Sequence, residues 1–401
     1  MSHFFKIWIQ LLLAAILISL CSLCHAEFSD DDSDMESLTT GTTSAVKSLP
    51  QYMVDNHLHD ELQRYQRALQ EPWPLIPGKL LKQGRKNESV LLLRQRLRQT
   101  GDLASTLDTH NKYFDYDLED ALKSFQSRHG LTDDGVMGPM TANELNVSPA
   151  IRIQQIQMNM QRWALISNKL ADRYIMVNIP EFQLHLFEDG KEILTMKTIV
   201  GKPDWQTPEL VSKIYRIIFN PSWNVPDKIA ANDVIPKAMD DPYYLDDMHI
   251  KVYLRGPHAR EINHRNIDWA RVDSKDLPYD FKQEPGEENA LGVIKFEFAN
   301  THDVYMHDTP AKSLFEQPLR ALSHGCVRLE NPMALVDYLM KDDPKWDSFR
   351  AQELIDTRQT SYQRIKKPIP IYITYFTVWV DDNGVVNYRN DVYNRDANNE
   401  L

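Results

Sequence analysis

The spacing of apolar residues changes along the chain and predicts two kinds of structure. In the first half, apolar side chains recur at helical spacing, and each such stripe predicts an amphipathic helix. From residue 174 onward, apolar and polar positions mostly alternate, which is typical of strands. Helices are expected near residues 58–70, 90–97, 118–125, 139–145, 151–169 and 332–340, and strands at 174–179, 182–187, 192–200, 213–219, 293–298, 369–380 and 385–388.

Turn residues mark where several of these elements end. Asp189-Gly190 is a two-residue hairpin signal, and Gly130 occupies the position of a helix C-cap. The last two expected strands, joined through Asn383-Gly384, predict a terminal hairpin. Residues 224–289 interrupt the strand pattern with a long polar segment rich in proline and aromatic residues. Long segments of this kind are usually functional, so this one is expected to be an insertion that forms a lid or cap.

The first residues resemble an export signal. Residues 7–23 are almost wholly apolar, and Lys6 precedes them. Cys24-His25-Ala26 then offers small residues at the −3 and −1 positions, which predicts a secretory signal peptide cleaved after Ala26. The alternative is an uncleaved anchor in the inner membrane. Residues 27–50 are acidic and rich in Ser and Thr, without a hydrophobic period, and are expected to form a disordered linker.

The composition excludes several classes of protein. With 42% hydrophobic and 25% charged residues the chain is globular rather than fibrous or wholly disordered. Its formal net charge of −12 disfavours binding to nucleic acid or anionic lipid. Cys21 and Cys24 leave with the signal peptide, so the mature protein keeps only Cys326. A disulfide scaffold is therefore excluded, and the single thiol calls for a different role.

The neighbours of Cys326 indicate nucleophilic chemistry. An imidazole can take the thiol proton, and His307 and His324 are both candidates for this role. Gly325 allows the backbone to approach a substrate carbonyl, and nearby N–H groups can bind a developing oxyanion. Arg328 falls on the same strand face as the thiol, where it lowers the thiol pKa or holds a substrate carboxylate.

Three alternative roles for the cysteine fit the sequence less well. A structural cysteine is disfavoured by its His, Gly and Arg neighbours. A zinc site built from His302, His307, His324 and Cys326 matches no common ligand spacing. A papain-like protease places its cysteine before its histidine in the chain, whereas His307 precedes Cys326.

The motifs together resemble a known family. His307, followed after fifteen residues by Ser-His-Gly-Cys-Val-Arg, resembles the signature of L,D-transpeptidases with a YkuD-type catalytic domain. Residues 121–141 resemble a peptidoglycan-binding module. Residues 177–184 resemble the first strands of that catalytic domain, and residues 200–208 resemble the loop that follows them. Residues 220–226 and 283–292 resemble motifs of the larger, periplasmic branch of the family, so the resemblance spans nearly the whole mature chain.

The resemblance implies a role for each candidate residue. Cys326 is the expected nucleophile and His307 the general base, while His324 and Gly325 shape the oxyanion hole. In this family the group that orients the base is often a backbone carbonyl or a small polar residue. The Asp308 carboxylate either contacts the imidazole or caps the following turn, and Tyr305 and Trp223 are either pocket walls or core. The substrate-binding set is Arg328, Ser323, Tyr305, Trp223 and Asp308.

The expected fold is α+β, with a mostly β YkuD-like catalytic domain and cap insertion, a helical scaffold and a three-helix peptidoglycan-binding domain. The expected organisation is a signal peptide (1–26), a disordered linker (27–50), a first helical scaffold segment (51–86), the peptidoglycan-binding domain (87–147), a second helical scaffold segment (148–172), the catalytic domain (173–345, cap about 224–289) and a C-terminal helix and β-hairpin (346–401).

The resemblance also implies the reaction. The expected enzyme forms 3→3 peptidoglycan cross-links through a Cys thioester on tetrapeptide stems, in the periplasm. Its partners are donor and acceptor stem peptides, with carbapenem-type β-lactams as covalent inhibitors, and it needs no cofactor, metal, nucleic acid or obligate protein partner. Alternatives are an L,D-carboxypeptidase, attachment of a protein to the wall by the same acyl-enzyme, or a non-catalytic peptidoglycan-binding protein.

Overall fold

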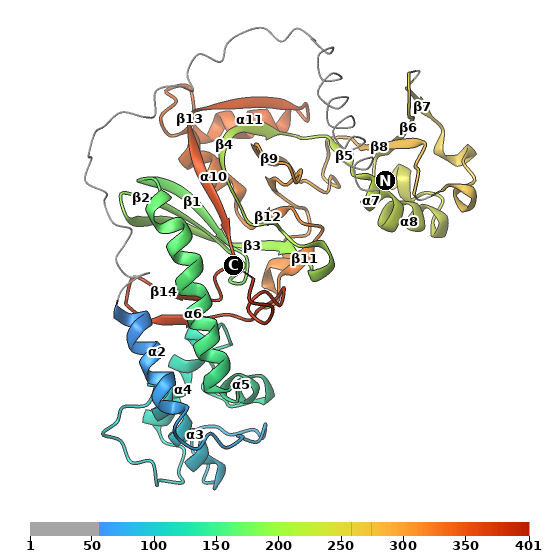
Figure 1. The fold of residues 1–401 in the computed structure, drawn as a ribbon. Helices are drawn as coiled ribbons and strands as arrows, with labels where there is room; N and C mark the ends of the chain where they lie inside the picture. Colours follow the sequence, from blue (N-terminus) through green and yellow to red (C-terminus); the bar gives the residue numbers. More distant parts are fainter. Residues whose placement is uncertain (1–55, 258, 274, 401) are drawn as a thin grey trace, which may run out of the picture. The chain divides into compact units, whose positions relative to one another are not determined.

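The chain combines an N-terminal helical region with a large β-sheet, which confirms the α+β class (Figure 1). This computed structural model describes residues 56–257, 259–273 and 275–400. The expected signal peptide and linker, residues 1–26 and 27–50, lie outside the described residues. Within the described ranges, no helix has the length and apolarity that crossing a membrane requires.

Three short helices form the module expected near residues 87–147. Their apolar stripes meet in one core that includes Val90, Leu118 and Leu145. Gly130 adopts a φ of +66° just after the second helix, as the C-cap position requires. The helices are α3 (Ser89–Gln99), α4 (Tyr116–Arg128) and α5 (Pro139–Leu145).

Two further helices connect this module to the sheet. The helices α2 (Asn56–Ala68) and α6 (Pro149–Ile166) pack on each other and on the hairpin formed by β14 (Val378–Val380) and β15 (Val386–Tyr388). Farther along α6, Trp163 packs on the outer face of the main sheet, against Met176 and Phe376. The scaffold therefore joins segments from both ends of the chain.

The main sheet closes on itself. Its strand order is β11-β3-β12-β10-β9-β4-β13-β1-β2, and a further pairing of β2 with β3 completes a barrel. Asp189 and Gly190 both have positive φ in the β2–β3 turn, as the hairpin signal predicts. The strands are β1 (Arg173–Asn178), β2 (Gln183–Glu188), β3 (Lys191–Gly201), β4 (Leu210–Phe219), β9 (Ile294–Phe298), β10 (Met306–His307), β11 (Ala321–Ser323), β12 (Val327–Leu329) and β13 (Ser361–Thr374).

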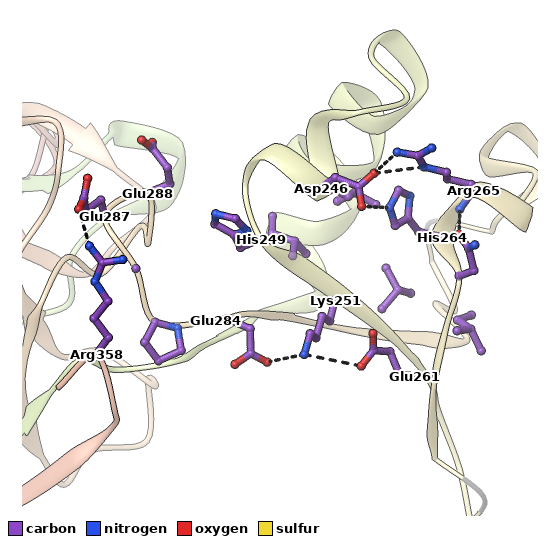
Figure 2. Close-up of a pocket in the computed structure, with 17 residues that line it drawn as sticks. Asp246, His249, Lys251, Glu261, His264, Arg265, Glu284, Glu287, Glu288 and Arg358 are labelled. Carbon is purple, nitrogen blue, oxygen red and sulfur yellow. Dashed lines mark hydrogen bonds and ion pairs between the residues drawn. The ribbon is translucent and has the colours of Figure 1, made fainter.

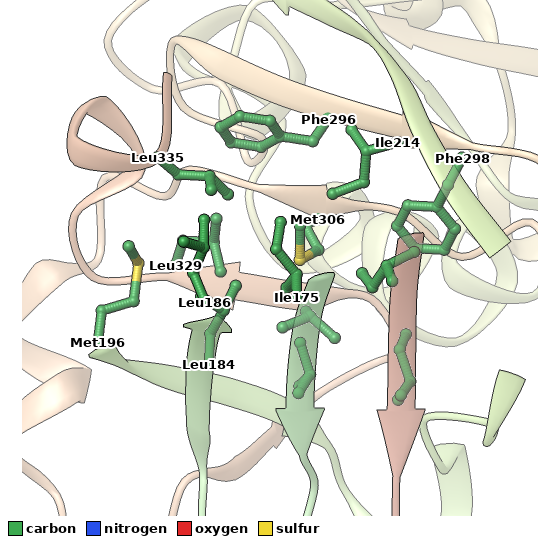
Figure 3. Close-up of a cluster of buried hydrophobic side chains, with 14 of the residues drawn as sticks. Ile175, Leu184, Leu186, Met196, Ile214, Phe296, Phe298, Met306, Leu329 and Leu335 are labelled. Carbon is green, nitrogen blue, oxygen red and sulfur yellow. The ribbon is translucent and has the colours of Figure 1, made fainter. Parts of the chain in front are cut away.

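The inward-facing residues of these strands form one hydrophobic core (Figure 3). Ile175, Leu184 and Phe296 come from different strands and meet there, because alternate residues of a strand point to the same side. Leu335 of α10 (Pro332–Met340) and Leu354 of α11 (Ser348–Asp356) extend the core. This rigid barrel positions the site described below.

The segment expected to be a cap at about 224–289, called the cap below, has a core of its own and begins with a strand at Trp223. Its strands β5 (Trp223–Val225), β8 (Tyr279–Gln283), β6 (Ile250–Leu254) and β7 (Arg260–Ile262) form a four-stranded sheet in that order. Val234, Leu245 and Phe281 are buried between this sheet and short helices. The helices are α7 (Asp227–Ile229), the π-helix η4 (Ala230–Val234), α8 (Ile235–Asp240) and α9 (Tyr244–Asp247).

One sequence expectation about strands is wrong. Residues 369–380 do not form a single strand of a terminal hairpin, because the chain leaves the sheet between β13 and β14. Strand β13 begins at Ser361, far earlier than expected, and lies between β1 and β4 in the barrel. Its exposed Lys366-Lys367-Pro368 stretch, where the register shifts, masks the alternation that would have revealed its first half.

Candidate active site on the barrel strands

Two neighbouring strands bring the candidate thiol and imidazole to the same face of the sheet. Strands β10 and β12 run parallel, and His307 lies directly opposite Arg328. Met306 and Val327 are fully buried in the barrel core. Since successive side chains alternate, His307, Arg328 and Cys326 point to the other face. Cys326 directly precedes β12, so His307 and Cys326 lie on adjacent segments at this face of the sheet.

A backbone carbonyl orients the imidazole of His307. Its Nδ1 lies 2.5 Å from the carbonyl oxygen of Asp308. A carbonyl only accepts hydrogen bonds, so this contact assigns the proton to Nδ1 and leaves the lone pair on Nε2. That is the tautomer a general base needs.

The carboxylate of Asp308 serves a different purpose. It accepts hydrogen bonds from the Val293 backbone N–H (3.0 Å) and from Lys312 Nζ (2.6 Å), and it is nearly buried. The expectation that this carboxylate contacts the imidazole is therefore wrong. A substrate contact by this carboxylate does not fit its position either. The resemblance allows a backbone carbonyl in this orienting role, and the carbonyl of Asp308 is the group that the structure places there.

Burial keeps both reacting groups neutral at rest. Burial and the charges of Arg328 and Lys295 together lower the pKa of His307 to about 3, against the opposing effect of hydrogen bonds to the Asp308 and Leu291 carbonyls. Burial also raises the pKa of the Cys326 thiol above its usual 9.0, although hydrogen bonds from Tyr305 and the charges of Lys295 and Arg328 oppose this. The resting pair is therefore a thiol and a neutral imidazole, not a thiolate–imidazolium ion pair.

Tyr305 lies directly beside the thiol. Burial, the charge of Cys326 and a hydrogen bond to Cys326 all raise the pKa of its phenol, while a hydrogen bond from Trp223 lowers it. Lys295 Nζ lies 4.1 Å from the centre of the Tyr305 ring, within the range of a cation–π interaction. Trp223 belongs to cap strand β5, so the cap reaches the thiol through this tyrosine.

The side chain of Ser323 holds the loop that precedes Cys326. Ser323 Oγ donates to the Cys326 carbonyl at 2.6 Å and accepts from the Gly325 N–H at 3.1 Å. Ser323 is only 2% exposed. Its predicted substrate contact does not fit this position, because the hydroxyl is already engaged within the loop. Gly325 has a φ of +112°, which favours glycine at this point.

His324 packs on an indole that a lysine of the cap also contacts. Its ring packs edge-to-face on Trp205, with centroids 4.7 Å apart, and Lys228 of the cap lies 3.8 Å from the same indole. Burial lowers the pKa of His324, Lys202 adds to the effect, and Asp233 of the cap opposes it. His324 therefore links the nucleophile loop to the cap through Trp205, whereas the ring of His307 is oriented by a backbone carbonyl, as a general base requires.

Arg328 brings positive charge into the site without a counter-ion. Within the described residues no carboxylate pairs with it, and its Nε is buried without a hydrogen-bond partner. Burial lowers its pKa, and Cys326 opposes that effect. A partly buried guanidinium without a carboxylate partner among the described residues favours an incoming carboxylate.

The cap also contains a separate cavity of about 1010 Å³ (Figure 2). Lys251 lies between Glu261 and Glu284 there, at 3.8 and 3.6 Å, and Arg358 pairs with Glu287. None of its lining residues is one of the candidates named above. The cations of this cavity already have carboxylate partners, so it is distinct from the site at Cys326.

Comparisons with known proteins agree with this site. Residues 172–346 match the “L,D-transpeptidase catalytic domain” and residues 86–145 the “Putative peptidoglycan binding domain”. A curated protein of Haemophilus influenzae, described as “Putative L,D-transpeptidase”, is 32% identical over 256 residues, which are 64% of this chain and 50% of that protein. The chain thus spans about half the length of this relative.

Solved structures give a weaker likeness. The L,D-transpeptidase of Xylanimonas cellulosilytica is 14% identical and covers 76% of this chain and 100% of its own, with a TM-score of 0.23. L,D-transpeptidase 3 of Mycobacterium tuberculosis, solved with a faropenem-derived adduct, is 11% identical and covers 51% and 60%, with a TM-score of 0.24. At these scores the overall superposition is poor. The domain matches carry the conclusion: this chain contains an L,D-transpeptidase catalytic domain and a peptidoglycan-binding domain.

Proposed function

We propose that the protein is a cysteine-dependent L,D-transpeptidase that forms 3→3 cross-links between peptidoglycan stems. The observation that carries this proposal is the shared sheet face of His307 and Cys326, with the His307 proton assigned to Nδ1. A thiol beside an imidazole whose Nε2 is unprotonated is ready for nucleophilic attack on a carbonyl carbon. The catalytic and peptidoglycan-binding domains supply the class of substrate.

The first step transfers the donor acyl group to sulfur. Cys326 attacks the carbonyl of the third residue of a tetrapeptide stem, and His307 Nε2 takes the thiol proton. The C–N bond to the terminal D-alanine breaks, and His307 gives that proton to the leaving amine. The backbone N–H of Cys326 stabilises the oxyanion, since the Gly325 N–H is bonded to Ser323.

The second step releases the acyl group to an amine. The side-chain amine of a diamino acid on an acceptor stem attacks the thioester, His307 takes a proton from it, and the proton returns to the sulfur as the C–S bond breaks. Water as acceptor would make the protein an L,D-carboxypeptidase. Trp223 and Lys228 of the cap flank the site, and a cap that excludes water favours the amine.

The unpaired Arg328 supports a substrate with a free carboxylate, which stem peptides carry. Export to the periplasm, as the first 26 residues predict, would bring the enzyme to this substrate. A carbapenem is expected to acylate Cys326 in the same way as the donor stem, since its strained carbonyl meets the same nucleophile.

Incubation of the purified protein with a disaccharide-tetrapeptide tests the proposal. Mass spectrometry should find released D-alanine and a cross-linked dimer, and neither with Cys326→Ala. D-Alanine without dimer would favour the carboxypeptidase. Binding without release of D-alanine would favour a non-catalytic wall-binding protein and overturn the proposal.

A further inference from the structure

We propose that Thr207 and Tyr393 are positioning residues that aim the backbone N–H of Cys326 at the reacting carbonyl. This inference rests on the proposed acyl transfer. It assigns a role in the active site to Tyr393, which lies beyond residue 346, where the match to the catalytic domain ends.

The first link holds the peptide group between Gly325 and Cys326. Thr207 Oγ1 donates a hydrogen bond to the Gly325 carbonyl at 2.7 Å. In a planar trans peptide the carbonyl oxygen and the next N–H point in opposite directions. Thr207 is fully buried beneath the loop. A carbonyl directed at Thr207 therefore directs the Cys326 N–H away from the interior, toward the face that carries the thiol.

This N–H is the one that the loop leaves for an oxyanion. The neighbouring Gly325 N–H is bonded to Ser323 Oγ, whereas the Cys326 N–H has no partner within the described ranges. Its direction depends on the rotation of a single peptide group. Without the Thr207 bond that rotation is unconstrained on the carbonyl side, because Gly325 tolerates a wide range of backbone angles.

The second link holds Thr207 itself. Thr207 Oγ1 accepts from the Gly201 N–H at 2.8 Å. The Tyr393 hydroxyl donates to the Gly201 carbonyl at 2.6 Å and accepts from the Thr207 N–H at 3.2 Å. A Cβ on Gly201 would lie 2.0 Å from the Trp205 carbonyl oxygen, so the turn closed by these bonds leaves no room for a side chain. Tyr393 thus clamps both ends of the turn that presents Thr207.

The third link anchors Tyr393 in the C-terminal segment. Its backbone N–H donates to the Tyr375 hydroxyl at 2.7 Å, and that hydroxyl donates to Asp391 Oδ1 at 2.7 Å. The hydroxyls of Thr207, Tyr393 and Tyr375 each donate one hydrogen bond and accept one, so the donor and acceptor roles of the whole series are mutually consistent. Tyr393 and Tyr375 are buried, at 4% and 0% exposure. The series therefore runs through the protein interior from Asp391 to the nucleophile loop.

The test separates the oxyanion step from the reactivity of the thiol. Thr207→Val keeps the shape of the side chain and removes its hydroxyl. Tyr393→Phe removes only the hydroxyl that bonds to Gly201 and Thr207. Thr207→Ser keeps a hydroxyl that can donate to the Gly325 carbonyl. Acylation of Cys326 by the donor tetrapeptide is followed by intact-protein mass spectrometry, and alkylation by iodoacetamide, which forms no oxyanion, is followed in parallel. Tyr388→Phe is the matched control, because it removes a buried hydroxyl bonded to Glu61 in the scaffold.

Thr207→Val should slow acylation about 100-fold and Tyr393→Phe about 10-fold, since small misplacements of catalytic groups have effects of this size. Alkylation should stay within about twofold of wild type in both, and Thr207→Ser should recover acylation to within about threefold. Tyr388→Phe should behave as wild type in both assays.

Two results would overturn the positioning role. One is unchanged acylation in both Thr207→Val and Tyr393→Phe. The other is an equal fall of acylation and alkylation, which would indicate a merely structural effect, and Tyr393→Phe gives this comparison even where Thr207→Val does not fold. A wild-type protein that releases no D-alanine would instead refute the proposed function, so the two failures are distinguishable.

Discussion

Arg128 offers a direct test of how firmly the peptidoglycan-binding module is attached to the scaffold. This arginine of α4 forms two 2.7 Å bonds to the Asp102 carboxylate and one to the Thr100 carbonyl at 3.1 Å. Its Nη1 also lies 3.4 Å from Glu61 Oε1 on scaffold helix α2. The side chains of Arg128, Asp102 and Glu61 are 7%, 3% and 3% exposed, so this ion pair is buried at the junction.

The expected cost of Arg128→Met follows from which carboxylates lose their partners. Removing one member of a buried ion pair costs about 3–5 kcal/mol, because the remaining charge has no counter-ion. Glu61 retains Arg64 at 2.5 Å and the Tyr388 hydroxyl at 2.9 Å, whereas Asp102 retains, among side chains of the described residues, only the Thr100 hydroxyl at 2.6 Å. The loss should therefore come mainly from Asp102 and lie near ~3 kcal/mol.

Urea unfolding followed by far-UV circular dichroism measures this loss. The control is Arg255→Met, which also removes an arginine from two carboxylates, at 2.7 and 2.6 Å. There the three side chains are 38%, 61% and 55% exposed, so the change should cost less than about 1 kcal/mol. Equal losses in the two variants would refute the argument that burial makes the Arg128 cluster strong.

Three further predictions concern pH and packing. Glu181 and Glu192 raise the pKa of His185 from 6.5 to about 10, so the stability it gives is complete below pH 6.5 and disappears as pH rises through about 10. His185→Asn should therefore lose about 3 kcal/mol in urea unfolding at pH 6 and much less at pH 10.5, and a pH-independent loss would contradict this. Because burial keeps the pKa of Cys326 above 9.0, its alkylation by iodoacetamide should rise about tenfold per pH unit from pH 7 to 9, and a plateau below pH 8 would indicate an ion pair instead. Gly201→Ala should lower stability by about 2–3 kcal/mol in thermal unfolding, because its Cβ meets the Trp205 carbonyl, and an unchanged Tm would show that the turn can relax.

The parts of the fold that could be predicted from sequence are those whose signals are local. The Asp189-Gly190 turn depends on two adjacent residues that accept positive φ, and Gly130 ends its helix for the same reason. The spacing of His307 and Cys326 likewise lies within one continuous stretch of chain. Such features need no knowledge of distant contacts.

Other features depend on contacts between distant segments, which periodicity does not reveal. The cap sequence is polar overall, yet Phe281 and Leu245 belong to one buried core beside a sheet of four short strands. The bonds from Thr207 to Gly325 and from Tyr393 to Gly201 join positions 118 and 192 residues apart. A threonine and a tyrosine in isolation carry no signal of this kind.

The site could be predicted to different depths for different residues. The motif implies the nucleophile and the base but leaves open whether a backbone carbonyl or the Asp308 carboxylate orients the base, and in the structure the Asp308 carbonyl makes this contact. Ser323 is expected to meet the substrate and instead holds its own loop. The sequence predicts which residues lie at the site more readily than it predicts which atom of each residue makes the contact.

The most direct test of the central claim is the rate at which a donor tetrapeptide acylates Cys326 in wild type and in His307→Asn, measured by intact-protein mass spectrometry in a single turnover. If His307 Nε2 accepts the thiol proton during attack, the variant should acylate about 10²–10⁴-fold more slowly at pH 7. Acylation of His307→Asn at the wild-type rate would contradict the account.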